Sequence, residues 1–207
     1  MMDSRAARRA MIDSQLRPEG VTDAFVLAAM GSVERENFVP ETSRAFAYFD
    51  RTLPLGNGRA MMPPAALGRL LSELAPRPGE RALVVAAGAG YSAALLKTIG
   101  LDVTAVESDP ALAAQARASG VEIAGADHKS LKGGYDLILI DGGVEVIPDQ
   151  LVALLADGGR LATAIIDRGV SRLAIGRASG GVLGLSTIVD AAVAPLPGFE
   201  RPRAFTF

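Results

Sequence analysis

From Arg81 onward the sequence alternates between short runs rich in aliphatic and β-branched residues and longer runs with helical spacing. This alternation is typical of βαβ units, in which successive strands lie parallel in one sheet and helices cover its faces. We expect strands over 81–86, 102–106, 121–124, 136–141 and 159–166. We expect helices over 91–99, 109–118 and 148–156. The pattern predicts an α/β fold with a doubly wound, mostly parallel sheet.

The segments on either side of this core have weaker patterns. Helical spacing is found over 3–16, 22–31 and 65–75, whereas 34–62 has no regular period apart from one helical turn expected near 41–48. After Gly169, two β-like segments flank Ser179-Gly180-Gly181 and predict a closing antiparallel hairpin. These segments are 171–177 and 182–190, and 203–207 is a candidate for a final edge segment.

Composition excludes several classes of site. The chain of 207 residues suits a single domain and contains no apolar run long enough to span a membrane. Its formal charge of −2 lacks the basic excess that nucleic-acid binding requires. The absence of cysteine excludes disulfides and thiolate chemistry, and a single histidine, His128, excludes a histidine-rich metal site. With no cysteine and one histidine, we expect no bound metal. No secretory signal is recognisable, so we expect a cytoplasmic protein.

The most informative motif is a glycine-rich turn between the first strand and helix of the βαβ core. The apolar run 82–86 leads into Gly88-Ala89-Gly90, and Glu107 ends the next strand, seventeen residues after Gly90. Glycines at a strand end let the backbone approach a ligand, and the following helix offers unpaired N–H groups. Glu107 is positioned to accept hydrogen bonds from both hydroxyls of an adenosine ribose. The motif predicts a nucleoside site.

Two alternatives stay open at this point. The glycines can simply form a tight turn while Glu107 caps the next helix. In addition, Gly88-x-Gly90-x-x-Ala93 satisfies the dinucleotide fingerprint, so the spacing alone does not distinguish NAD from another adenosine cofactor.

Several segments, in the right order, resemble the protein-L-isoaspartate O-methyltransferases. The segment 35–40 resembles the family's R-x-x-F-V-P pattern, and 48–56 resembles its Y-x-D-x-P-L-P-I-G loop. The other matching segments are 11–17 (the opening helix), 88–93 (the cofactor turn), 135–141 (the fourth strand) and 158–161 (the turn into the fifth strand). The resemblance covers nearly the whole chain.

The resemblance implies methyl transfer from S-adenosylmethionine to an isoaspartyl carboxylate of a protein or peptide, a reaction of protein repair. It implies a Rossmann-like methyltransferase fold with three regions: N-terminal helices and a substrate-side loop (1–78), a cofactor-binding core (79–168) and C-terminal antiparallel strands (169–207). The expected cofactor-binding residues are Ala86, Gly88, Gly90, Tyr91, Glu107, Ser108 and Asp127. The expected catalytic residues are Asp50, Arg59, Met62 and Asp141. The oligomeric state is not predictable.

Three positions depart from the family pattern. Where the family loop reads G-Q-T-I-S-x-P, residues 58–64 place Met62 at the position of the serine that contacts the substrate carboxylate. A thioether cannot donate a hydrogen bond. Val84 replaces an acidic residue that can favour a cationic cofactor, and Ala86 replaces a glycine, which costs roughly 1–2 kcal/mol if φ is positive there. A catalytically impaired homologue acting as a binding module is therefore a second hypothesis, and an NAD-dependent oxidoreductase is a third.

Four further side chains are candidates for the site, and three of them also have a structural interpretation. Asp127 could accept a hydrogen bond from an adenine amine or be a solvated loop residue. Asp141 faces the crevice beyond the fourth strand and could orient the methyl acceptor or the cofactor's ammonium group, or cap a helix. Arg59 has the planar fork that binds a carboxylate in a bidentate manner. Met61, together with Met62, could line an apolar substrate cleft or pack in the core.

Overall fold

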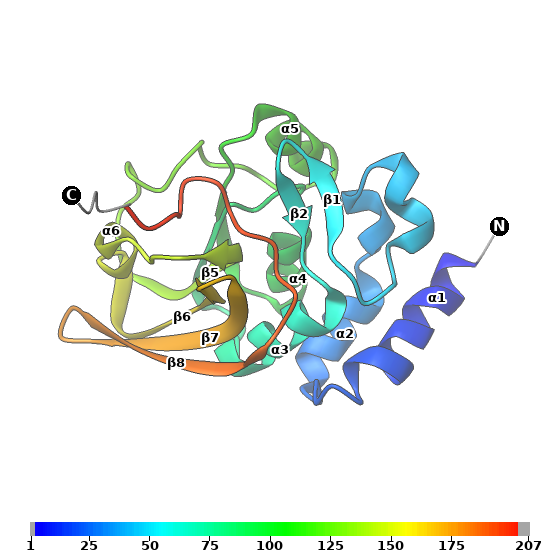
Figure 1. The fold of residues 1–207 in the computed structure, drawn as a ribbon, viewed down its shortest axis with the longest axis horizontal. Helices are drawn as coiled ribbons and strands as arrows, with labels where there is room; N and C mark the ends of the chain where they lie inside the picture. Colours follow the sequence, from blue (N-terminus) through cyan, green and yellow to red (C-terminus); the bar gives the residue numbers. More distant parts are fainter. Residues whose placement is uncertain (1–2, 203–207) are drawn as a thin grey trace.

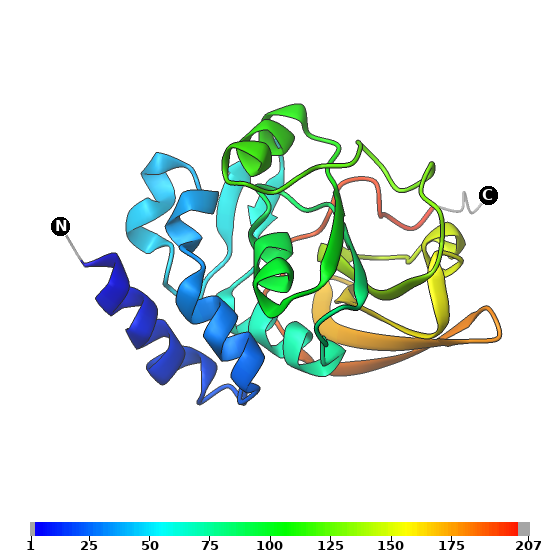
Figure 2. The same cartoon turned by 180° about the vertical axis from the view of Figure 1, so that it is seen from behind.

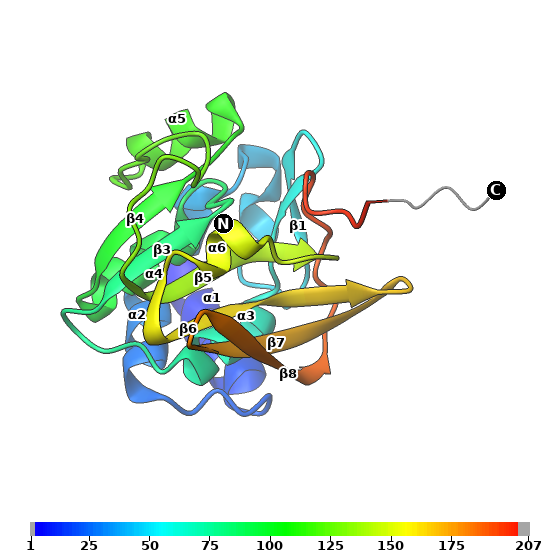
Figure 3. The same cartoon turned by 90° about the vertical axis from the view of Figure 1, so that its left-hand side faces the viewer.

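The computed structural model describes residues 3–202, and its centre is a six-stranded sheet. The strand order is β4-β3-β5-β6-β7-β8 (Figures 1 and 3). The first four of these strands are parallel: β3 (Arg81–Val85), β4 (Asp102–Val106), β5 (Tyr135–Val144) and β6 (Leu155–Asp167). An antiparallel hairpin, β7 (Val170–Ser179) and β8 (Val182–Asp190), follows. The predicted fold class is confirmed.

Alternate residues of the parallel strands pack into two separate cores. Val84 and Leu139 face the core that contains helices α3 (Pro64–Leu74), α4 (Tyr91–Ile99) and α5 (Pro110–Ala118). Leu83 and Ile138 face the other core, with the short helix α6 (Asp149–Val152) and Leu196. Because successive strand side chains point to opposite faces, a sheet buried on both sides is apolar at every position.

The N-terminal region forms a helical layer at one end of the molecule (Figure 2). Helix α1 (Ser4–Met11) continues into the π-helical turn η1 (Ile12–Leu16), and α2 (Ala24–Ser32) packs beside both α3 and α4. Two 3-10 turns follow, η2 (Arg35–Phe38) and η3 (Glu41–Phe46). The sequence predicts helices over 3–16 and 22–31 and a helical turn near 41–48. The elements α1 with η1, α2 and η3 confirm these predictions.

Two predicted elements differ in the structure. Residues 121–124 do not form a strand: a single bridge joins Gly125 to Val106, while Val121 and Ile123 are buried in the helix-side core. The helix predicted over 148–156 ends at Val152, because the carbonyl of Leu154 accepts hydrogen bonds from the amides of Gly134 and Tyr135 and draws the chain into β6. Residues 203–207 lie outside the described residues.

The segment 34–62 also contains a hairpin that its sequence did not predict. Strands β1 (Leu53–Gly56) and β2 (Arg59–Met61) pair antiparallel, with Leu53 opposite Met61. Elements of three and four residues are too short to show an alternating pattern. This hairpin is important because it lies over the carboxyl end of β3, where the expected nucleoside site is located.

The close packing of the segment 193–199 against β5 generates the first prediction. A Cβ atom at Gly143 would lie 2.7 Å from Ile166 Cδ1 and 3.0 Å from the carbonyl oxygen of Ala194. We expect Gly143→Ala to lower the free energy of unfolding by about 1–3 kcal/mol through overpacking. Urea unfolding measures the change. The control is Gly184→Ala on β8, where the nearest atom lies 3.8 Å away; an equal loss in both variants would contradict the packing argument.

Candidate active site

The site is located where the strand order changes direction. β3 lies between β4 and β5, with Val85 opposite both Val106 and Ile140, so the chain leaves β3 at the same sheet edge as it leaves β4. Ligands of open α/β sheets bind in the crevice at such a switch point. The turn 86–90, Glu107 and Asp141 all lie at this edge.

The turn itself has a strained backbone. Ala86 has φ +56°, Gly88 +59° and Gly90 +96°. Positive φ is tolerated by glycine and is costly for alanine, because its Cβ approaches the following carbonyl oxygen. The condition under which Ala86 was expected to be unfavourable is therefore met. The two glycines have the conformational freedom that the turn requires.

The carboxylate of Glu107, which follows β4, is buried against the turn 86–90. Its Oε2 accepts a hydrogen bond from the amide of Gly88 at 2.6 Å, and its Oε1 accepts one from the amide of Asp109 at 2.8 Å. Its side chain is 0% exposed, so the carboxylate is held in one orientation between two backbone amides. Such charge-assisted bonds fix the group in place before any ligand binds.

Arg59 of β2 forms an ion pair with this carboxylate. Its Nη1 lies 2.6 Å from Glu107 Oε1, and its Nη2 donates to the carbonyl oxygen of Ala86 at 2.8 Å. The side chain is 6% exposed, and its Nε has no hydrogen-bond partner among the described residues. We expected Arg59 to bind a substrate carboxylate and Glu107 to bind a ribose; in the structure they bind each other.

Two other contacts of the turn differ from expectation. Leu55 of β1 covers Gly88, where a Cβ atom would lie 3.2 Å from Leu55 Cδ1. A Cβ atom at Gly90 would lie 3.0 Å from Val121 and 3.2 Å from the Ala116 side chain, so Gly90 allows close packing of the turn against the α5 region rather than open space for a ligand. The backbone of the turn is thus enclosed on two sides.

Arg59 stands between two cavities of different size. The larger one, about 310 Å³, is lined by side chains that follow β4 and by the irregular segment 126–129, including the predicted Ser108 and Asp127. The smaller one, about 10 Å³, is lined by the predicted Ala86, Gly88, Tyr91 and Asp141, with Leu55 and Met61. A cavity of about 10–15 Å³ holds one water molecule, so only the larger space can admit a nucleoside base.

Asp141 is held within β5 beside this smaller cavity. Ser92, in the first turn of α4, donates a hydrogen bond from its hydroxyl to Asp141 Oδ2 at 2.5 Å. Burial raises the pKa of Asp141 to about 6, against the lowering effect of the Ser92 hydrogen bond and of the nearby Arg59 and Arg35 charges. This carboxyl group therefore changes its ionisation close to neutral pH.

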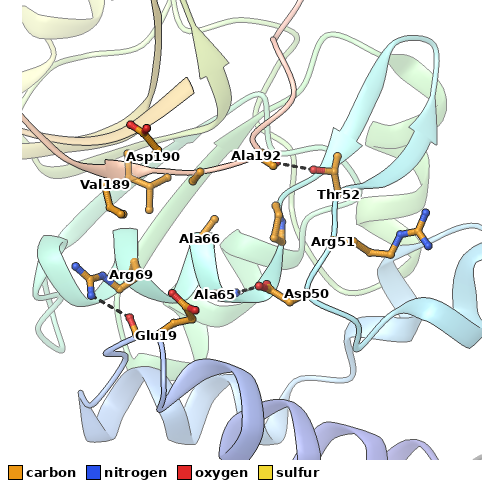
Figure 4. A pocket seen from close by; sticks show the side chains of 13 residues that line it. Glu19, Asp50, Arg51, Thr52, Ala65, Ala66, Arg69, Val189, Asp190 and Ala192 are labelled. Carbon is orange, nitrogen blue, oxygen red and sulfur yellow. Dashed lines mark hydrogen bonds between the residues drawn. The ribbon is translucent and has the colours of Figure 1, made fainter. Parts of the chain in front are cut away.

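Two other predicted catalytic residues lie elsewhere. Asp50 accepts a hydrogen bond from the amide of Ala65 at 3.0 Å, at the start of α3, and lines a separate cavity of about 500 Å³ (Figure 4). Met62 is 2% exposed, and its carbonyl oxygen accepts a hydrogen bond from Arg35 Nη2 at 2.5 Å. Neither side chain lines the cavity that contains Asp141.

Comparisons with known proteins identify the family. The model of the protein-L-isoaspartate(D-aspartate) O-methyltransferase family matches residues 6–180. Protein-L-isoaspartate O-methyltransferase of Methylorubrum populi is 41% identical over 165 residues, 75% of this chain and 78% of that protein. Protein-L-isoaspartate O-methyltransferase 1 of Rhodopseudomonas palustris is 35% identical over 208 residues, 94% of this chain and 84% of that protein. This chain belongs to the protein-L-isoaspartate O-methyltransferase family.

The solved structures support the same fold. One protein-L-isoaspartate O-methyltransferase superimposes with a TM-score of 0.79 at 18% identity, over 95% of this chain and 66% of that one. A second, from Plasmodium falciparum in complex with S-adenosyl-L-homocysteine, has a TM-score of 0.76 at 19% identity and covers 95% of this chain and 99% of that one. The expected resemblance is confirmed. Family membership also favours S-adenosylmethionine over NAD as the nucleoside ligand.

Three neighbours of the family site were not predicted from the sequence. Leu55 and Ser92 lie within the segments 48–56 and 88–93 that resemble the family, and the helix start Tyr91-Ser92 places a hydroxyl near β5. Arg35 begins the R-x-x-F-V-P segment and is fully buried: its Nε donates to the carbonyl of Ala47 at 2.8 Å, and its guanidinium stacks on Tyr91 at 4.8 Å. Arg35 thereby fixes the backbone on both sides of the hairpin.

The strain at the family's glycine position gives the second prediction. We expect Ala86→Gly to raise the free energy of unfolding by about 1 kcal/mol, because glycine adopts the observed φ of +56° without the penalty of a Cβ atom. Thermal and urea unfolding measure the gain. The matched control is Ala89→Gly in the same turn, which has no positive φ and is expected to destabilise. A loss of stability in Ala86→Gly would contradict the strain.

Burial of Asp141 gives the third prediction. Because its pKa in the folded protein is about 6, above the ordinary value of 3.8, the folded protein binds this proton more tightly than the unfolded chain. Its stabilising contribution is complete below pH 3.8 and is lost as the pH rises through about 6. We expect this loss to be about 1–3 kcal/mol in the wild type and absent in Asp141→Asn.

The test compares urea unfolding of both proteins from pH 4 to pH 8, with Glu122→Gln at an exposed position as the control. If Asp141→Asn and the wild type lost stability in parallel over this range, the shift of the Asp141 pKa would be refuted.

Proposed function

We propose that this chain transfers a methyl group from S-adenosylmethionine to the side-chain carboxylate of an isoaspartyl residue in a protein or peptide. One observation carries the proposal: a buried carboxylate, Glu107, is fixed by the amides of Gly88 and Asp109 at the switch point of the sheet. A preoriented carboxylate in this position is suited to binding the two ribose hydroxyls of an adenosine. The family match supplies the reaction class.

The residues present fit the nucleoside half of the cofactor. The cavity of about 310 Å³ follows β4 directly and is lined by Ser108 and Asp127, whose oxygen atoms can accept hydrogen bonds from an adenine or ribose. Its walls also include apolar side chains, Val106, Leu196 and Phe199. Most nucleoside pockets combine such apolar walls with a few polar groups.

The residues beside the transferred methyl group take no covalent part in the reaction. S-adenosylmethionine, when bound, supplies a methyl group on a sulfonium; the acceptor carboxylate oxygen forms the new O–CH₃ bond as the S–CH₃ bond breaks. The acceptor is already an anion, so no protein base is needed, and the chain acts by positioning the reactants. We assign Asp50 a positioning role, through its hydrogen bond to the start of α3, and Asp141 a role beside the reacting groups. Met62 contributes no donor.

The proposed partner is a protein or peptide in the cytoplasm. The charge of −2 and the absence of cysteine support this assignment over nucleic-acid binding or thiol chemistry. No helix within residues 3–202 combines the length and apolarity needed to cross a lipid bilayer.

The fourth prediction tests the nucleoside site. We expect the wild type to bind S-adenosylhomocysteine in a calorimetric titration, and Glu107→Gln to bind about tenfold or more weakly, since an amide offers one acceptor oxygen where the carboxylate offers two. Asp127→Asn, at the exposed end of the same cavity, is the control, with a smaller expected effect. Methylation is measured on an isoaspartyl peptide and on the matching aspartyl peptide. Binding of NAD alone would favour an oxidoreductase, and binding of neither ligand would favour a module without this activity.

A further inference from the structure

We infer that Arg59 exchanges partners during the proposed reaction: it pairs with Glu107 until a cofactor ribose displaces it, and it then binds the carboxylate of the methyl acceptor. The inference rests on the proposed function and adds to it a specificity-determining residue. Arg59 lies on β2, outside the β-turn-α unit that forms the cofactor site, and it is the only basic residue among those that line the smaller cavity in the described part of the chain.

The first step follows from the acceptor capacity of Glu107. A carboxylate offers about four lone-pair sites, and Glu107 uses three of them, for the amides of Gly88 and Asp109 and for Arg59. Two ribose hydroxyls need two sites, whereas one is left. The two amides belong to the backbone of the turn and of the α5 N-terminus, so the side chain of Arg59 is the group that can leave. Ribose and Arg59 therefore compete for the same carboxylate.

The second step follows from the state in which Arg59 is left. A buried guanidinium without a counter-ion is strongly unfavourable, so Arg59 requires a new anionic partner when it leaves Glu107. Its Nε already lacks a partner while Nη1 and Nη2 are bonded, which leaves part of the planar fork open to a further acceptor. A carboxylate accepts two parallel hydrogen bonds from such a fork.

Among the described residues that line the smaller cavity, Arg59 is the only charged donor for the acceptor carboxylate. Met62, three residues after Arg59, stands where the family has a serine, and its side chain donates no hydrogen bond. Arg59 stands where the family loop has a neutral glutamine, and it borders both the larger cavity and the smaller one. A guanidinium released from Glu107 is thus placed between the nucleoside pocket and the space beside Asp141. Arg59 replaces the lost hydroxyl with a charged donor.

Arg59 is expected to weaken binding of the cofactor, with which it competes for Glu107, and to strengthen binding of the peptide, whose carboxylate it contacts. An arginine that only blocked the site would weaken the binding of both. Arg59→Gln, which restores the family's neutral residue, is expected to bind S-adenosylhomocysteine about tenfold more tightly, since no ion pair is broken. With saturating S-adenosylmethionine, the same variant is expected to raise KM for an isoaspartyl peptide about tenfold or more, with a smaller change in kcat. Arg59→Lys keeps the charge and should restore part of the peptide affinity.

The control for loop loosening is Asn57→Gly at the tip of the same hairpin. Asn57 has φ +50° and donates to Asp109 Oδ2 at 2.7 Å, so glycine removes the exposed hydrogen bond without straining the turn. Its affinity for S-adenosylhomocysteine should change less than that of Arg59→Gln. An equal gain in both variants would attribute the effect to hairpin opening and overturn the inference, as would an Arg59→Gln variant with unchanged cofactor affinity or unchanged peptide KM.

Loss of the proposed function has a different signature. If neither the wild type nor Arg59→Gln bound S-adenosylhomocysteine or methylated the peptide, the methyltransferase assignment itself would fail. If the wild type methylated the peptide and Arg59→Gln behaved identically, only the partner exchange would fail. Thermal unfolding of each variant verifies that the protein folds when Glu107 has no arginine partner. If Arg59→Gln unfolds, Arg59→Lys tests the recruitment step alone: it keeps a charge beside Glu107 but loses the planar fork, so the KM for the peptide should rise with little change in cofactor affinity. An unchanged KM in that variant would overturn the inference.

Discussion

The buried carboxylate of Glu107 organises the site because three segments that surround it are bonded to this one group. It accepts hydrogen bonds from the turn after β3 and from the residue preceding α5, and it pairs with Arg59 of β2. A buried charge must be fully compensated by hydrogen bonds or by an ion pair. The hairpin, the glycine turn and the end of β4, which are distant in sequence, are therefore held in one arrangement by a single group.

The sheet makes this arrangement possible by bringing three strand ends together. The register of β3 with β4 and β5 aligns Val85 with Val106 and Ile140, so the residues that follow these strands meet at one edge. Two features at that edge are locally unfavourable. Ala86 adopts a positive φ, and burial raises the pKa of Asp141 to about 6. Such unfavourable local features persist only where the surrounding structure determines them, and they are concentrated at functional sites.

Periodicity in the sequence was sufficient to predict the parallel sheet, its closing hairpin and the turn at Gly88, because each element is specified by residues that are close together in the chain. It was not sufficient for residues 121–124, where Val121 and Ile123 pack in the helix-side core and the chain bonds to β4 only at Ala124 and Gly125. Nor could it predict the partner of Arg59, since Glu107 is 48 residues away in the chain and the contact depends on a hairpin of very short strands. Local patterns specify elements; long-range pairing of polar side chains depends on the assembled fold.

The departures from the family pattern are physically connected rather than independent. Val84 is 0% exposed between β4 and β5, so an apolar residue there is stable, and its presence removes a negative charge from the region of the turn. Arg59 adds a positive charge at the same edge and neutralises Glu107. Both changes reduce the attraction of the site for a cationic cofactor, whereas a site with a free guanidinium attracts an anionic acceptor. In the partner exchange proposed for Arg59, these charges favour the acceptor over the methyl donor.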